Sequence, residues 1–227
     1  MKLLLTSAGI SNNSIRKALV DLLGKPIEES TALFVPTAIY GIKNGSDIIR
    51  RVICGRLGDP FCEAGWKSLG ILELAALPTV KKEIWEPMLR ETDALLVGGG
   101  DCQYLCYWMR QSGLTQLLPQ LLEKTVYVGL SAGSMIMTSF GTTYGNHVLP
   151  PDSEKSLGML DFAIHPHLDY PAFPDNSLTN LEKLAALLPM PSYLIDDQTA
   201  IKVIDGNVEV ISEGKWKLYD PGKIKNL

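Results

Sequence analysis

The segment Gly129-Leu130-Ser131-Ala132-Gly133 places a serine between small residues, after an apolar run and before a helix-period segment. Small residues on both sides let a chain turn sharply from a strand into a helix, so that the serine hydroxyl projects from the turn. A serine held in this way is a candidate nucleophile for acyl transfer. A Gly-Ser turn without chemistry is the alternative interpretation of the same pattern.

A serine nucleophile needs a base, and the sequence has three histidines, His147, His165 and His167. His165 and His167 follow a predicted strand that ends at Ile164, whereas His147 lies in a Gly-Asn turn region. We expect His167 to be the base and His165 to have a pocket or structural role. Two histidines at i and i+2 without a Cys or carboxylate at ligand spacing make a weak metal site. We therefore expect no metal and no organic cofactor.

The imidazole of a catalytic histidine needs a carboxylate that orients it and stabilises its charged form. Asp196 and Asp197 directly follow the predicted strand Tyr193–Ile195 and meet this demand. Adjacent residues that leave a strand point to opposite sides, so the two cannot serve equally. An acidic turn before the next strand is the alternative interpretation.

Acyl chemistry also needs donors for a tetrahedral oxyanion. The N–H of Ala132 is one candidate, and the run Gly98-Gly99-Gly100 at the end of a predicted strand can supply another. The glycine run does not match the phosphate-binding patterns G-x-x-x-x-G-K-[ST] and G-x-G-x-x-G, so nucleotide binding is disfavoured. Asp101 follows the run, and we group it with Gly100, His165 and Asp196 as predicted substrate-pocket residues.

Apolar runs and helix-period segments alternate along the whole chain, which indicates an α/β fold with a mostly parallel central sheet and helices on both faces. The predicted strands are Leu3–Leu5, Ala32–Val35, Gly70–Leu74, Ala94–Val97, Val126–Leu130, Phe162–Ile164 and Tyr193–Ile195. The predicted helices are Ile15–Leu23, Ser46–Leu57, Val80–Arg90, Gln103–Arg110, Thr115–Lys124 and Thr179–Leu188. In such a sheet, ligands bind outside the carboxyl ends of the strands, where the candidate residues fall.

The region after residue 201 has a different pattern. Lys202–Ile204 and Val208–Val210 flank Asp205-Gly206-Asn207, which is typical of a β-hairpin, so we expect a short antiparallel extension. We find no linker-like stretch and expect residues 1–227 to form a single domain. The segments Leu149–Ser156 and Asp169–Ser177 are predicted loops that could shape a pocket.

The composition excludes several classes of protein. The chain has 227 residues, 46% of them hydrophobic, and its net charge of -4 gives no basic surface for nucleic acid or anionic lipid. The apolar run at Leu3–Leu5 is too short for a signal peptide, and charges, Pro or Gly interrupt every longer apolar stretch. We expect a cytoplasmic protein whose four cysteines, Cys54, Cys62, Cys102 and Cys106, are reduced and buried.

The order of the candidate residues in the chain is also informative. Ser131, His167 and Asp197 do not follow the Ser, acid, His order of α/β-hydrolases. Asp152 and Asp161 could supply the acid in that order, but no histidine lies beyond residue 167 to complete it. An ordinary esterase is therefore disfavoured.

The motifs together resemble those of the peptidase E (aspartyl dipeptidase) and cyanophycinase family of serine peptidases. The resemblance lies in VPTA (35–38), VGGGD (97–101), GLSAGS (129–134), HPHL (165–168) and IDDQTAI (195–201), in the family's order. It implies a three-layer fold similar to class I glutamine amidotransferases (flavodoxin-like). It also implies Ser131 as nucleophile, His167 as base, Asp197 as acid, and an oxyanion hole formed by the Gly99 region and Ala132.

The sequence departs from the family in two places. Asp197 stands where the family usually has an acidic residue, often Glu, so a shorter side chain must reach the imidazole, or Asp196 must share the task. The aspartyl dipeptidase branch is expected to bind the acidic side chain of its substrate through an arginine downstream of the catalytic histidine, but this sequence has no Arg after Arg110. Lys155 or Lys183 would have to take that place, without the two-pronged geometry of Arg.

The leading hypothesis is a serine peptidase that acts on dipeptides or short peptides, with a small peptide as its only predicted partner. The alternative is a non-catalytic binding or regulatory protein on the same fold. A glutamine amidotransferase is disfavoured because that chemistry needs a cysteine at the turn, where neither Cys102 nor Cys106 lies. The sequence leaves open whether the chain is a monomer or a homodimer.

Overall fold

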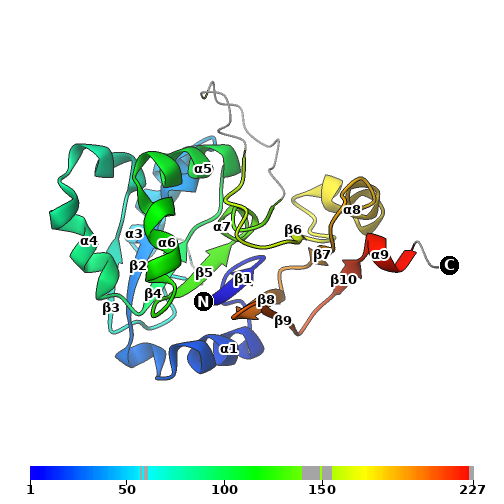
Figure 1. Cartoon of the computed structure of the whole chain (residues 1–227), viewed down its shortest axis with the longest axis horizontal. Helices are drawn as coiled ribbons and strands as arrows, with labels where there is room; N and C mark the ends of the chain where they lie inside the picture. Colours follow the sequence, from blue (N-terminus) through cyan, green and yellow to red (C-terminus); the bar gives the residue numbers. More distant parts are fainter. Residues whose placement is uncertain (57, 59–60, 140–148, 150–154, 225–227) are drawn as a thin grey trace.

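The computed structural model describes residues 1–56, 58, 61–139, 149 and 155–224 (Figure 1). In these residues the strands form two sheets. The larger one has the order β3-β2-β4-β5-β1-β8-β9, and the smaller one has the order β10-β7-β6. No helix among the described residues is long and apolar enough to cross a membrane.

The first five strands of the larger sheet are parallel, as predicted. They are β3 (Ser68–Ile71), β2 (Thr31–Val35), β4 (Ala94–Val97), β5 (Val126–Leu130) and β1 (Lys2–Thr6). Apart from the edge strand β3, these strands are almost continuously apolar because both faces of the sheet are covered. β5 pairs with β1 so that Gly129 lies opposite Leu5 and Leu130 opposite Thr6, which puts the strand ends at one edge.

The predicted hairpin extends this sheet in the antiparallel direction. β8 (Thr199–Ile204) pairs with β1, and β9 (Asn207–Ser212) pairs with β8. Asp205 and Gly206 in the turn have φ angles of 48° and 85°. Two successive positive φ angles are what a two-residue type I′ turn requires, which explains the Asp-Gly pair in the sequence.

Helices cover both faces of the central sheet and give a three-layer arrangement (Figure 1). Alternate strand residues supply the two apolar clusters: Leu4 and Phe34 face one layer, and Leu5 and Leu33 face the other. The first layer contains α1 (Asn13–Leu23) and α3 (Gly45–Ile53), and the second contains α4 (Lys82–Arg90), α5 (Cys102–Gln111) and α6 (Leu114–Leu121). Short helical segments complete the described chain: η1 (Ile27–Glu29), α2 (Thr37–Tyr40), η2 (Leu74–Thr79), α7 (Ala132–Met135), η3 (Pro174–Asn176) and α9 (Pro221–Ile224).

Several predicted boundaries were wrong. The strand predicted at Gly70–Leu74 is β3, which ends at Ile71, because Leu74 already begins η2. The helix predicted to reach Leu57 ends at Ile53, and Leu57 lies outside the described residues. The predicted burial of the four cysteines is wrong for two of them: Cys54 is exposed, since it follows the last residue of α3, and Cys62 is only partly buried.

The last two predicted strands do not join the parallel sheet. β6 (Ala163–His165) and β7 (Ser192–Ile195) pair with each other, and β10 (Trp216–Tyr219) adds to β7 in a separate three-stranded sheet. The free edge of β1, where a further parallel strand would pair, is taken by β8. The small sheet is covered by α8 (Leu178–Ala185) and lies to one side of the central sheet in Figure 1.

Candidate active site

Ser131 lies on the sharp turn between β5 and α7. Its φ and ψ angles are 50° and -109°, which are unusual for a residue with a side chain. The neighbouring glycines make this turn sterically feasible. A Cβ atom on Gly129 would lie 2.7 Å from the backbone N of Ser134, and one on Gly133 would lie 2.1 Å from the carbonyl oxygen of Val97. Larger residues at 129 and 133 are therefore excluded by the backbone itself.

Hydrogen bonds from buried side chains hold the turn in place. The Tyr127 hydroxyl donates to the carbonyl oxygen of Gly133 at 2.6 Å, and the Ser134 hydroxyl donates to that of Thr6 at 2.8 Å. The Ser131 N–H also donates to the Thr6 carbonyl, at 3.0 Å. Burial raises the pKa of Tyr127 well above its ordinary value, so its hydroxyl stays a donor. Neither Tyr127 nor Thr6 was predicted as a site residue.

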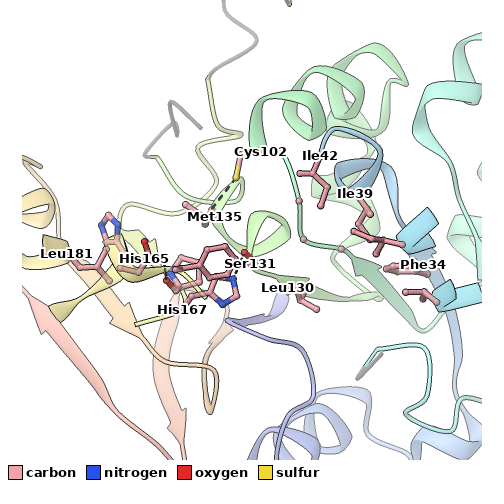
Figure 2. Close-up of a pocket in the computed structure, with 18 of the residues that line it drawn as sticks. Phe34, Ile39, Ile42, Cys102, Leu130, Ser131, Met135, His165, His167 and Leu181 are labelled. Carbon is pink, nitrogen blue, oxygen red and sulfur yellow. Dashed lines mark hydrogen bonds between the residues drawn. The ribbon is translucent and has the colours of Figure 1, made fainter. Parts of the chain in front are cut away.

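His167 lies between Ser131 and Asp197 (Figure 2 shows its side chain beside Ser131). Its Nε2 atom is 2.9 Å from the Ser131 Oγ, and its Nδ1 atom is 2.7 Å from Oδ1 of Asp197. An ionised carboxylate can only accept a hydrogen bond, so Nδ1 carries the proton in the neutral ring and Nε2 is left to accept from the serine hydroxyl. The structure thus brings together the three residues predicted to act as nucleophile, base and acid.

The three residues come together in a different way from the prediction, which placed them all at the carboxyl ends of strands in one sheet. His167 follows β6 of the small sheet, and Ser131 follows β5 of the central sheet, so the two residues do not share a sheet edge. Asp197 lies in the connection that leaves β7 and enters β8. The candidate active site is therefore at the junction of the two sheets.

Of the two adjacent acids, only Asp197 reaches His167. The Asp196 carboxylate turns the other way: Oδ1 accepts from the Thr199 hydroxyl at 2.7 Å and from the Gln198 N–H at 3.0 Å, and Oδ2 accepts from the Lys215 N–H at 2.5 Å. Asp196 therefore holds the turn between the sheets together. The shorter side chain of Asp197, compared with Glu, is sufficient for contact with the imidazole.

Ser7, which was not predicted as a site residue, joins this network. Its hydroxyl donates to Oδ1 of Asp197 at 2.7 Å and accepts from the backbone N–H of His167 at 2.8 Å. Burial of the Asp197 carboxylate raises its pKa, but the hydrogen bonds from His167 and Ser7 outweigh burial, so the pKa of Asp197 is lowered from 3.8. The position of Ser7 directly after β1, at the same edge as Ser131, is its one local signal in the sequence, and that signal does not show the contact with Asp197.

Gly99 and Ala132, the two residues predicted to form an oxyanion hole, both lie beside Ser131. A Cβ atom on Gly99 would lie only 3.2 Å from the Ser131 Cβ, so the glycine backbone is in close contact with the serine. Ala132 is the first residue of α7, and the N–H of a first helical residue has no acceptor within its own helix. Both residues thus lie beside Ser131, and their role as oxyanion donors stays a prediction.

A cavity of about 530 Å³ opens beside Ser131 and His167 (Figure 2). Gly100 and His165, two of the four predicted pocket residues, line it, and so does Gly99. Burial lowers the pKa of His165 to about 4, so its ring is neutral at physiological pH.

The other two predicted pocket residues, Asp101 and Asp196, are not among the lining residues. Asp101 is buried, and its Oδ1 accepts from the Tyr104 N–H at 2.8 Å, which makes it the N-cap of α5.

The two lysines considered for an acidic substrate side chain do not line the cavity either. Lys155 and Lys183 are both exposed, and Lys183 lies in the last turn of α8.

Other candidates from the sequence have no place in the described site. His147 and Asp152 lie outside the described residues. In the described part of the chain, no group of three or more His, Cys, Asp or Glu side chains could hold a metal ion. Cys106 is buried, which raises the pKa of its thiol to about 12 and leaves it unreactive.

The fold is similar to two solved structures. One is a Listeria monocytogenes EGD-e protein provisionally named peptidase E, with a TM-score of 0.66, 18% identity and coverage of 94% of this chain and 98% of that one. The other is a peptidase from an acI-B1 Actinobacterium, with a TM-score of 0.63, 18% identity and coverage of 97% and 94%. At this identity the similarity shows the fold alone, and it confirms the predicted α/β architecture.

Sequence relatives carry the name peptidase E. The proteins of Shewanella amazonensis and Shewanella oneidensis are 34% and 32% identical to this chain over 99 residues, which is 42% of this chain and 42% of each relative's length. The Streptomyces coelicolor protein is 35% identical over 86 residues, or 36% of this chain and 35% of the relative. The alignments thus span about two fifths of the relatives' length.

The profile of peptidase family S51, by contrast, matches residues 3–211, which include the turn at Ser131, His167 and Asp197. The chain therefore belongs to peptidase family S51.

Proposed function

We propose that this protein is a serine peptidase that hydrolyses dipeptides or short peptides through an acyl-enzyme on Ser131. The observation that carries the proposal is the continuous hydrogen-bonded chain from Ser131 through His167 to Asp197. Membership of family S51 supports it, because the family gives the same class of chemistry. The negative net charge favours a small peptide as partner over nucleic acid or a membrane.

In the proposed reaction, the Ser131 Oγ attacks the scissile carbonyl carbon while His167 Nε2 takes the hydroxyl proton. The imidazole is then charged, and the Asp197 carboxylate at Nδ1 stabilises that charge. The carbonyl oxygen becomes an oxyanion, for which the N–H groups of Gly99 and Ala132 are the proposed donors. The strained backbone at Ser131 keeps the hydroxyl clear of the strand and directed at the cavity.

The tetrahedral intermediate collapses when the C–N bond breaks and His167 Nε2 gives its proton to the leaving amine. A water molecule then attacks the acyl group and loses its proton to His167. The second collapse releases the carboxylic acid and returns the proton to the Ser131 Oγ. All proton transfers use residues on the described chain, so the reaction needs no cofactor.

The experiment that tests this proposal is covalent labelling with a fluorophosphonate probe, followed by peptide mass mapping. We expect label on Ser131, and we expect it to be absent in Ser131→Ala and strongly reduced in His167→Ala. Ser46→Ala removes an exposed hydroxyl outside the cavity and serves as the matched control. A folded parent protein that resists the probe and has no peptidase activity would instead favour the non-catalytic binding protein.

A further inference from the structure

We infer that this peptidase takes substrates with large apolar residues on both sides of the scissile bond. The inference rests on the proposed function and specifies its substrate class. It follows from the chemistry of the cavity walls on the two sides of Ser131, together with the direction in which the proposed reaction must place the two halves of the substrate.

The wall beyond Gly99 and Gly100 is formed by aliphatic and aromatic side chains. In the view of Figure 2, Ser131 lies between this wall and the wall that contains Leu181. The lining residues on the first side, from β2, α2, α3 and the segments between them, are Phe34, Ile39, Ile42, Ile48 and Val52. Since the oxyanion must face Gly99 and Ala132 and the leaving amine must face His167, the acyl half of the substrate extends toward this wall.

The opposite wall receives the leaving group, because His167 Nε2 must lie within hydrogen-bond distance of the departing amine. The ring of Phe173 lies beside the His167 ring, with a centroid distance of 4.9 Å. Leu181 and Leu184 of α8 line the same side. Asn176 also lines the cavity, and its side-chain amide already donates a hydrogen bond to the Pro166 carbonyl oxygen at 3.0 Å. The residue after the scissile bond therefore also meets an apolar surface.

The cavity offers no countercharge to an acidic or basic substrate side chain. Among the described lining residues there is no Asp, Glu, Lys or Arg. A carboxylate that entered would lose its hydration without gaining an ionic partner, which is strongly unfavourable.

Two of the lining side chains are unusually exposed for large apolar residues. Ile42 is 40% exposed and Phe173 is 48% exposed, and they lie on opposite sides of the cavity. Apolar side chains in contact with an apolar ligand would be removed from water, which favours binding in proportion to the area covered. The cavity volume of about 530 Å³ is within the range of roughly 300–1,000 Å³ that is usual for small-ligand sites.

The acyl side is tested with the p-nitrophenyl esters of N-acetyl-leucine, N-acetyl-phenylalanine and N-acetyl-aspartate. We expect kcat/KM for the leucine and phenylalanine esters to exceed that for the aspartate ester by roughly 100-fold or more, because apolar contacts are gained and an unpaired charge is avoided. Ile42→Lys places a cation in the exposed part of the wall and should lower this ratio by about tenfold or more. Ile84→Lys makes the same change at an α4 residue that is 63% exposed and outside the cavity, and it should leave the ratio unchanged.

The leaving-group side is tested by capture of the acyl-enzyme with an added amine. During turnover of the N-acetyl-leucine ester, leucinamide and aspartic acid amide are supplied in turn, and transfer product is measured against hydrolysis by mass spectrometry. We expect leucinamide to be captured about tenfold better or more. Phe173→Ala should reduce that advantage, whereas Trp216→Ala, which removes a 46% exposed aromatic ring outside the cavity, should not.

The outcomes separate this inference from the proposed function. Ser131-dependent turnover with equal or better use of the aspartate ester and aspartic acid amide would overturn the apolar assignment and leave the peptidase mechanism in place. Ester hydrolysis that persists in Ser131→Ala, or no turnover of any ester by a folded parent protein, would overturn the mechanism and the inference with it. An apolar preference that both lysine variants change equally would also contradict the assignment of Ile42 to the substrate wall.

Discussion

The hydroxyl of Ser7 donates to Oδ1 of Asp197 at 2.7 Å, the same carboxylate oxygen that lies 2.7 Å from His167 Nδ1. The Ser7 hydroxyl also accepts a hydrogen bond from the backbone N–H of His167 at 2.8 Å. One buried hydroxyl thus fixes both the carboxylate and the backbone that carries the imidazole. Ser7 directly follows β1, whereas the carboxylate and the backbone N–H that it holds come from the connections after β7 and β6.

We expect Ser7→Ala to lower kcat by about 10- to 100-fold, since a hydrogen bond to a charged group contributes roughly 1.5–3 kcal/mol. KM should change little, because Ser7 is not among the cavity residues. Loss of the hydrogen bond should also raise the pKa of Asp197, so the acid limb of the kcat profile should move to higher pH. Steady-state kinetics across pH test both effects.

Ser11→Ala is the matched control for this prediction. The Ser11 hydroxyl donates to the backbone carbonyl of Asp197 at 2.6 Å and does not contact its carboxylate. We expect a smaller loss of kcat and no shift of the acid limb. Equal effects of the two substitutions on the pH profile would contradict the positioning role of Ser7.

The two adjacent acids should differ sharply in their effects. Asp197→Asn removes the charge that stabilises the His167 imidazolium, and kcat should fall on the order of 10⁴-fold, as in the serine protease template. Asp196→Asn weakens the hydrogen bonds to Thr199, Gln198 and Lys215 and should lower the free energy of unfolding by about 1 kcal/mol.

Kinetics and urea unfolding of both variants distinguish these roles. A large loss of kcat in Asp196→Asn, combined with near-parent activity in Asp197→Asn, would reverse the assignment of the acid.

The three residues that the structure brings together at the candidate active site could be predicted because each has a local signal. Ser131 lies in a G-x-S-x-G turn after an apolar strand, and His167 and Asp197 directly follow short strands. The close approach of Gly129 and Gly133 to backbone atoms explains why the pattern is specific to a turn of this kind. Their proposed catalytic roles stay predictions.

Other features could not be predicted, for identifiable reasons. The pattern of a short strand does not show which sheet it joins, so the separate sheet of β6 and β7 was missed. An Asp before a helix looks the same whether it contacts a ligand or caps the helix, and Asp101 is a cap. A serine after a strand is common, and only the approach of Asp197 from the far end of the chain distinguishes Ser7.

The buried ring of His165 should make the stability of the fold pH-dependent. Burial lowers its pKa from 6.5 to about 4, so between these values the unfolded chain binds a proton that the folded chain does not. Stability is therefore lost as the pH falls from about 6.5 toward 4, and at pH 5 the loss from this residue is roughly 2 kcal/mol. In His165→Gln this loss should be absent. Urea unfolding of both proteins at pH 7 and pH 5 measures the difference, and identical pH dependence in the two proteins would contradict the prediction.

The turn at Ser131 should be intolerant of a methyl group. In Gly133→Ala the new Cβ would lie 2.1 Å from the carbonyl oxygen of Val97, so α7 or β4 must move. We expect a loss of roughly 2–3 kcal/mol of unfolding free energy, typical of overpacking against well-packed structure. The loss of kcat should be larger than this destabilisation implies, because displacement of the turn misplaces the Ser131 hydroxyl relative to His167 Nε2.

Gly58→Ala is the control for that substitution, because the nearest atom to a Cβ there is Oε2 of Glu63 at 3.9 Å. It should leave kcat unchanged. Thermal unfolding shows whether Gly133→Ala is folded at the assay temperature, and the fluorophosphonate labelling rate then reports the reactivity of the folded fraction. A folded Gly133→Ala protein that labels at the parent rate would show that the tight packing of this turn is not needed to position the serine.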